Sequence, residues 1–80
     1  MHQPVHRLVL LVANLEQAIV YVISTTGRGM TTAQIANEIN EQQLYIRNDG
    51  LPVSSQQVYA VICRYPHIFT REGGLFYLIM

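Results

Sequence analysis

The sequence predicts a mainly α fold that ends in a small β-hairpin, and three observations carry this prediction. Apolar residues recur at helical spacing in three stretches, each opened by a residue type that caps helices. Near the C-terminus, two short β-prone runs flank a glycine pair, as in a hairpin. Half of the 80 residues are hydrophobic and only 12% are charged, which excludes a disordered chain and indicates one small domain.

The first helix is expected from about Leu15 to Thr25. Asn14 and Gln17 have the spacing of a capping box at its start. Gly27 and Gly29 supply the backbone angles that a helix end requires. The apolar positions between these two signals follow the helical repeat, so one face of this helix is expected in the core.

The sequence before this helix is compatible with more than one secondary structure. Apolar residues at helical spacing extend back to Leu8, so residues 6–13 either lengthen the helix or form a strand or an arm. We therefore divide the chain into an N-terminal arm or helix extension at residues 1–13 and a domain at residues 14–80.

A second helix is expected to begin at Thr31, which forms a capping box with Gln34. Its inner stripe consists of Ile35, Ala36 and Ile39. The helical pattern fades near residues 42–44. The connection that follows contains Asn48-Asp49-Gly50, a strong turn signal, and its flanking apolar residues are expected to pair briefly as a hairpin.

The third helix is expected to begin at Ser54, which forms a capping box with Gln57 and follows Pro52. Pro66 ends it, since proline disfavours a helical conformation in the residue before it. The inner face is expected to hold Val58, Val61, Ile62 and Tyr65. The outer face is expected to hold Gln56, Tyr59, Ala60, Cys63 and Arg64, with Gln57 at the margin.

The last element is a hairpin formed by residues 68–71 and 75–79 around Gly73-Gly74, a segment we treat as a wing over residues 69–79. Helix, helix, helix and hairpin within 80 residues is the plan of a winged helix-turn-helix domain. The sequence therefore predicts three helices followed by a C-terminal wing.

Part of the chain resembles a known family. Leu44-Tyr45, Arg47, Asp49-Gly50, Pro52-Val53, Gln57 and Tyr65-Pro66-His67-Ile68-Phe69 are similar to the HARE-type winged helix-turn-helix, in its bacterial branch associated with restriction endonucleases. The resemblance spans roughly residues 15–79 and is best over residues 44–69. It implies a DNA-binding accessory module, and a link to restriction–modification or transcription regulation. The chain departs from this family in lacking a basic excess.

We interpret the third helix, at about residues 54–65, as the reader of double-stranded DNA. Glutamine hydrogen-bonds adenine in the major groove, and arginine bonds guanine or a phosphate. Serine hydroxyls and backbone N–H groups at a helix start suit a phosphate. The candidate DNA-binding residues are Ser54, Ser55, Gln56, Gln57, Tyr59, Arg64 and Arg71. The alternative for Arg71, in the wing, is a surface ion pair with Glu72.

The charge of the chain limits this interaction. Five arginines balance five acids, and there is no lysine. Phosphate contacts are expected from about two to four arginines among Arg28, Arg47, Arg64 and Arg71, which predicts weak, salt-sensitive binding at low salt.

The rival hypothesis is a protein-interaction or dimerisation module with little affinity for DNA. A net charge near zero favours self-association. The segment Val5–Val12 is a surplus of apolar residues for a small core, so Val5, Leu8, Leu10 and Val12 are expected to pack in a homodimer or against a neighbouring domain.

Catalysis and metal binding are not expected. Neither paired acids at a plausible site, nor a phosphate-binding glycine loop, nor a Ser-His-Asp pattern is present. His2 and His6 have the spacing of two ligands on a helix but lack partners nearby in sequence, so no metal or other cofactor is expected. Tyr45 is expected at the edge of the core. A cytoplasmic location is expected because the longest apolar runs are too short to span a membrane.

Overall fold

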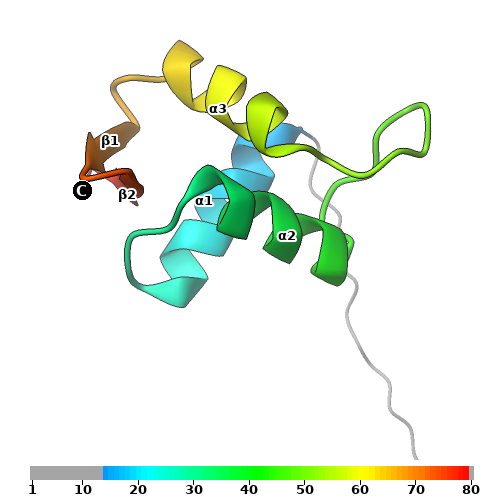
Figure 1. The fold of residues 1–80 in the computed structure, drawn as a ribbon, viewed down its shortest axis with the longest axis horizontal. Coiled ribbons are helices and arrows are strands. Elements are labelled where there is room, and N and C mark those ends of the chain that lie inside the picture. The colour runs from blue at the N-terminus through cyan, green and yellow to red at the C-terminus, as the bar shows by residue number, and fades with distance from the viewer. Residues whose placement is uncertain (1–13, 80) are drawn as a thin grey trace, which may run out of the picture.

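The computed structural model describes residues 14–79, which form three helices followed by a two-stranded antiparallel hairpin (Figure 1). The elements are α1 (Leu15–Thr26), α2 (Thr32–Gln42), α3 (Ser55–Arg64), β1 (Phe69–Glu72) and β2 (Leu75–Leu78). The predicted fold class and the predicted order of elements are confirmed. The arrangement is that of a winged-helix-like fold, with the hairpin in the position of the wing.

Local hydrogen bonds explain where the helices begin. The side chain of Asn14 accepts a hydrogen bond from the Gln17 amide at 2.9 Å. Thr31 and Ser54 each form a complete capping box, which satisfies backbone donors that a helix start otherwise leaves unpaired. The ends are marked by left-handed residues: Gly27, with φ of 75°, closes α1, and Gln43, with φ of 54°, closes α2.

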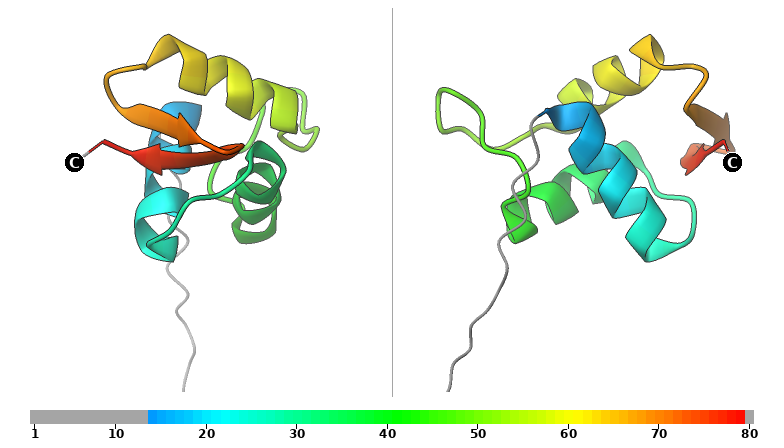
Figure 2. Two further views of the ribbon diagram at one scale, coloured as in Figure 1. Left: turned by 60° about the vertical axis from the view of Figure 1, so that its left-hand side comes forward. Right: turned by 180° about the vertical axis from the view of Figure 1, so that it is seen from behind.

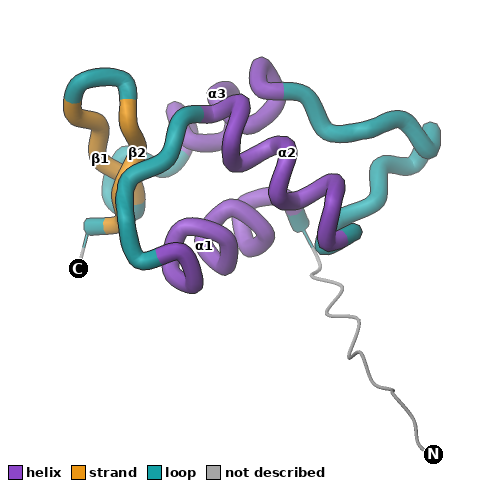
Figure 3. The backbone as a smooth tube through the Cα atoms, turned by 60° about the horizontal axis from the view of Figure 1, so that its bottom comes forward, coloured by secondary structure: helices purple, strands orange, loops and turns teal. Residues whose placement is uncertain are grey.

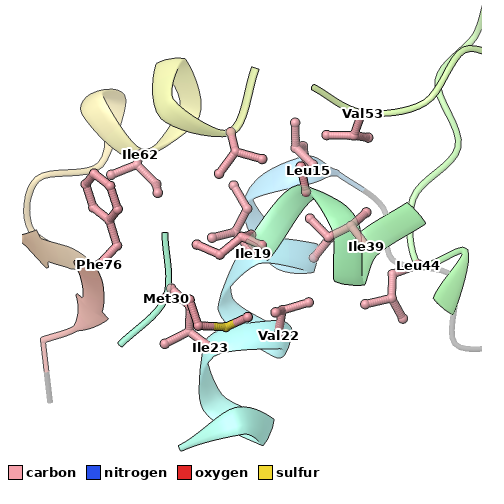
Figure 4. Close-up of a cluster of buried hydrophobic side chains, with 14 of the residues drawn as sticks. Leu15, Ile19, Val22, Ile23, Met30, Ile39, Leu44, Val53, Ile62 and Phe76 are labelled. Atoms are coloured by element: carbon pink, nitrogen blue, oxygen red, sulfur yellow. The ribbon is translucent and has the colours of Figure 1, made fainter. Parts of the chain in front are cut away.

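The core lies where the three helices meet, with the inner face of the hairpin against one side (Figure 4). The predicted stripe of α2 is confirmed, because Ile35, Ala36 and Ile39 are buried. On α3 the buried residues are Val58 and Ile62, whereas Val61 and Tyr65 are half-buried at the margin. Burial of these aliphatic side chains is the main force that holds the helices together.

The hairpin pairs Phe69 with Leu78 and Glu72 with Leu75, and its turn is made by two glycines with positive φ. It is also tied to the connection between α1 and α2. Met30 exchanges two backbone hydrogen bonds with Phe76, of 3.2 and 2.8 Å. This bridge adds a third segment at the edge of the hairpin (Figure 2), and the sequence analysis did not find it.

The hairpin expected at residues 44–53 is wrong. This segment forms a loop that extends away from the helices, at the end of the molecule opposite to β1 and β2 (Figure 3). It contains the predicted turn, closed by a hydrogen bond of 3.0 Å from the Gly50 amide to the Arg47 carbonyl. Strand pairing does not form because side chains bond the backbone groups that a ladder would use: Asp49 accepts from the Leu51 amide, and Asn40 holds both polar groups of Val53.

Candidate nucleic-acid interface

The outer face of α3 is exposed as its periodicity predicts. Its exposed residues are Gln56, Tyr59, Ala60, Cys63 and Arg64. Gln57 is half-buried at the margin. The side of α3 opposite to the core is therefore exposed to solvent over most of its length.

An aromatic stack joins this face to the hairpin. The ring of Tyr59 on α3 meets the ring of Phe76 on β2 edge-on, with centroids 6.2 Å apart. On the hairpin, the guanidinium carbon of Arg71 lies 5.5 Å from the centroid of the same Phe76 ring. Phe76 is buried, so it is a fixed support for both neighbours. The stack brings Tyr59 and Arg71 onto one surface, although the two residues lie on different elements.

Arg71 is positioned by this ring rather than by an acid. The alternative of an ion pair with Glu72 is wrong, since the only ion pair within residues 14–79 joins Arg47 and Asp49. The attraction between a guanidinium and an aromatic face leaves the N–H donors of the arginine open to solvent or to a ligand. Arg71 thus projects from the wing with its donors available.

At the start of α3, two of the predicted DNA-contact residues, Ser54 and Gln57, hydrogen-bond each other. The Ser54 hydroxyl accepts from the Gln57 amide at 3.1 Å, and the Gln57 side-chain carbonyl accepts from the Ser54 amide at 3.2 Å. The same carbonyl oxygen accepts a hydrogen bond of 3.0 Å from Arg47. The Gln57 oxygen is therefore occupied, and what Gln57 still offers to a ligand is its NH₂ group. Ser55, the first residue of α3, is half-buried beside the cap.

Arg47 belongs to the loop, where its charge is compensated. It pairs with Asp49 and also donates to the Pro52 carbonyl at 3.4 Å. The amide of Leu51 hydrogen-bonds the Asp49 carboxylate, and this bond, followed by the neighbouring Arg47, lowers the pKa of Asp49 below its ordinary value. The four arginines named as phosphate ligands are thus not equivalent. Arg71 lies on the hairpin against Phe76, Arg64 lies in the last turn of α3, and Arg28 lies in the connection between α1 and α2, where it lines a pocket with Tyr77 and Leu78 of β2.

A groove of about 370 Å³ runs between the start of α1 and α3. Arg64 and Glu16 both line it, so an arginine and an acid face the same groove without forming an ion pair. Tyr45 and Tyr65 also line the groove, and Tyr45 is half-buried against the core, as predicted. No local pattern indicates that Glu16 and Arg64 line the same groove, because the two residues lie on helices far apart in the chain.

Some candidate residues cannot be placed. Val5, Leu8, Leu10 and Val12, proposed as an interaction segment, lie outside the described residues, as do His2 and His6. Within residues 14–79, no group of three histidine, cysteine, aspartate or glutamate side chains is arranged to hold a metal ion. None of the described helices has both the length and the apolar character needed to cross a membrane.

Comparison of the chain with protein-family models, curated proteins and solved structures finds no match. The class of protein is therefore defined by the fold alone: three helices and a C-terminal hairpin that resemble a winged helix. Because one fold supports many functions, the function is argued from the surface of α3 and the hairpin.

Proposed function

We propose that this chain is a non-catalytic DNA-binding module in which α3 reads the duplex and the β1–β2 hairpin acts as the wing. One observation carries the proposal: the Tyr59–Phe76–Arg71 stack unites the outer face of α3 and the hairpin in one exposed surface. Arg71 lies on that surface and Arg64 is exposed in the last turn of α3, and neither forms an ion pair among the described residues.

The residues of this surface suit distinct parts of a duplex. Gln56 is exposed in the first turn of α3 and is suited to the edge of an adenine. Arg64, in the last turn, is suited to a guanine or a phosphate, and Arg71 to the backbone beside the wing. The N–H groups at the start of α3, next to Ser54 and Ser55, favour an anion such as a phosphate.

The resemblance to the HARE-type winged helix-turn-helix supports this role. It rests on residues 44–69, which in this chain comprise the loop, α3 and the exit to β1. Domains of that family are associated with restriction endonucleases and chromatin proteins, usually as accessories to another domain. We therefore propose an accessory or regulatory role in a system that processes or transcribes DNA.

The affinity of one copy is expected to be low. The chain has no net charge, and Arg64 and Arg71 each have an acid close by: Glu16 lines the groove of Arg64, and Glu72 follows Arg71 in sequence. A few phosphate contacts contribute little at physiological salt, since the affinity of such proteins depends steeply on the number of phosphates that they neutralise.

Fluorescence anisotropy with a labelled duplex at low salt tests the proposal. Arg64→Ala is expected to weaken binding about tenfold, because a direct charged contact is lost. Asn37→Ala is the control: it changes an exposed side chain on α2 that is not among the proposed contacts, and its effect is expected to be much smaller. Equal losses in both variants would show that α3 is not the reader, and no binding by the unmodified chain would favour the protein-interaction module.

A further inference from the structure

The side-chain amide of Gln57, the third residue of α3, is oriented by two hydrogen bonds. Its Oε1 atom accepts from the Ser54 backbone amide at 3.2 Å and from Nη1 of Arg47 at 3.0 Å. Both of these neighbours are donors without acceptor capacity, so the oxygen and not the amino group of the amide must face them. The two bonds use both lone pairs of the oxygen, whereas the Nε2 amino group has no acceptor within residues 14–79.

Arg47 holds this arrangement in place from the loop between α2 and α3. Its guanidinium pairs with Asp49 and donates to the Pro52 carbonyl at 3.4 Å, so it is anchored independently of Gln57. A hydrogen bond from a charged donor is also stronger than one between neutral groups. Because the side chain of Gln57 is fixed before a ligand arrives, it loses little conformational freedom on binding.

We infer that Gln57 is a specificity-determining residue of the reading helix, and that it donates its amino group to the N7 and O6 edge of guanine. This inference rests on the proposed function, in which α3 enters the major groove. The first residues of a reading helix are those that contact base edges, and Gln57 lies in the first turn of α3.

The occupied oxygen excludes the usual pairing of glutamine with adenine. That pairing needs both ends of the amide, because the oxygen accepts from the adenine N6 amino group while the amide nitrogen donates to N7. Guanine instead presents two neighbouring acceptors, N7 and O6, and no donor between them. A side chain that can only donate therefore matches guanine, whereas the N6 amino group of adenine opposes it.

A backbone phosphate is the other acceptor that the Gln57 amino group could contact. Such a contact positions the protein on the duplex and carries no sequence information. It therefore affects duplexes of different base chemistry equally, whereas a guanine contact depends on the acceptor atoms of the base. Two duplexes that differ only in these atoms separate the two contacts.

Gln57→Glu removes the donor and keeps the local structure. A carboxylate accepts the same two hydrogen bonds from Ser54 and Arg47, and glutamate is as suitable as glutamine at this position of a capping box. Gln34→Glu is the matched control, because Gln34 occupies the equivalent position in the capping box of α2. It introduces the same charge in the same local structure on a helix that is not the proposed reader.

Fluorescence anisotropy at low salt compares two labelled duplexes of equal length. One alternates guanine and cytosine. The other has 7-deazaguanine at each guanine, which replaces N7 by a C–H group and keeps the base pairing and the phosphates. The unmodified chain and Gln34→Glu are expected to bind the guanine duplex about tenfold more tightly, and in Gln57→Glu this ratio should fall to about threefold or less. Repulsion by the added carboxylate acts on both duplexes and cancels in the ratio.

The possible failures are distinguishable. Equal binding of both duplexes by the unmodified chain, or an unchanged ratio in Gln57→Glu, overturns the inference and leaves the proposed function standing. Weaker binding of both duplexes by Gln57→Glu with the ratio unchanged assigns Gln57 to a phosphate, which also overturns it. Absence of any binding by the unmodified chain contradicts the proposed function, and the inference with it.

Urea unfolding of Gln57→Glu tests the geometry without DNA. The midpoint of this variant is expected to be no lower than that of the unmodified chain, because the carboxylate keeps both accepted bonds and gains a charged partner in Arg47. A clearly lower midpoint would show that the oxygen does not hold these two bonds, and the inference would then lose its basis.

Discussion

Asn40 on α2 and Val53 at the end of the following loop are joined by two hydrogen bonds of 2.9 Å, one in each direction. The side-chain amide donates to the Val53 carbonyl, and the side-chain oxygen accepts from the Val53 amide. Val53 is buried, so these backbone groups have little access to water. Asn40 therefore fixes the position at which the chain leaves the loop and enters α3, the helix that we propose reads DNA.

Replacing Asn40 tests this role. Asn40→Ala is expected to lower the free energy of unfolding by about 1–2 kcal/mol, because both polar groups of Val53 lose their partner in a mostly buried position. Urea denaturation measures the change. Asn37→Ala removes an exposed asparagine from the same helix and should change stability by less than about 0.5 kcal/mol. Equal effects of the two substitutions would contradict the assigned role.

Gly29 and Tyr77 provide a second test, of the contact between the α1–α2 connection and the hairpin. A Cβ atom at position 29 would lie 2.5 Å from Cζ of the Tyr77 ring, far inside contact distance. Gly29→Ala therefore requires the half-exposed Tyr77 ring to shift, and it is expected to destabilise the fold by up to about 1 kcal/mol. In the background of Tyr77→Ala the obstructing ring is absent, so the same substitution should cost much less.

Thermal or urea unfolding is measured for the unmodified chain, the two single variants and the double variant. The four unfolding free energies give the coupling between positions 29 and 77. Gly27→Ala serves as a contrast. A Cβ there meets no atom, and its cost should come from the positive φ of 75° and not depend on Tyr77. An identical cost of Gly29→Ala in both backgrounds would show that the ring does not limit position 29.

Because Arg47 and Asp49 form an ion pair in the loop, we expect the free energy of unfolding to depend on pH. The Leu51 amide and Arg47 hold the pKa of Asp49 below its ordinary value of 3.8 in the folded chain. A lowered folded pKa means that the carboxylate stabilises the fold at neutral pH, and that this contribution is lost as the pH falls below 3.8 and through the folded pKa. Asp49→Asn is thus expected to be less stable than the unmodified chain at neutral pH.

The difference in unfolding free energy that the two chains show at neutral pH should shrink at an acidic pH below the folded pKa of Asp49, where the carboxyl is protonated in both states. Asparagine keeps an oxygen that accepts from the Leu51 amide, so the substitution removes the charge and keeps the local hydrogen bond. Urea unfolding at both pH values measures this. A difference that stays constant across the range would contradict the proposed electrostatic role.

Elements whose signals are local were predictable from the sequence. The starts of α2 and α3 were predictable from Thr31 and Ser54, because each capping box is complete within four residues. The glycine pair Gly73-Gly74 likewise predicts the turn of the hairpin, and both residues adopt positive φ in the structure. Helical periodicity then places the outer face of α3, so the exposure of Gln56, Tyr59 and Arg64 followed from spacing alone.

Features that join distant segments were not predictable. The bridge between Met30 and Phe76 depends on backbone groups, which carry no sequence signal. The clamp between Asn40 and Val53 was missed for a related reason: an asparagine in the last turn of a helix does not reveal which backbone it bonds. The hairpin expected in the loop was wrong because Asp49 and Asn40 bond backbone groups that strand pairing would have needed.

The candidate site was predictable only in part. Arg64 and Arg71 were each predicted as DNA-contact residues from the sequence. Nothing in the sequence indicated that contacts of Tyr59 and Arg71 with the Phe76 ring join α3 to the wing. The sequence also did not show that Arg47 is engaged within the loop, or that Glu16 shares a groove with Arg64. The engagement of Arg47 leaves Arg28, Arg64 and Arg71 as the arginines expected to contact phosphates.

The salt dependence of duplex binding tests the central claim most directly. Anisotropy titrations from about 20 to about 200 mM salt should give a log–log slope of about −2 to −3, because Arg64, Arg71 and, beside the hairpin, Arg28 each neutralise at most one phosphate. The double variant Arg64→Ala, Arg71→Ala should lose this salt-dependent binding while staying folded. Binding that is absent from the unmodified chain at the lowest salt, or that survives unchanged in the double variant, would contradict the proposed role of the α3–hairpin surface.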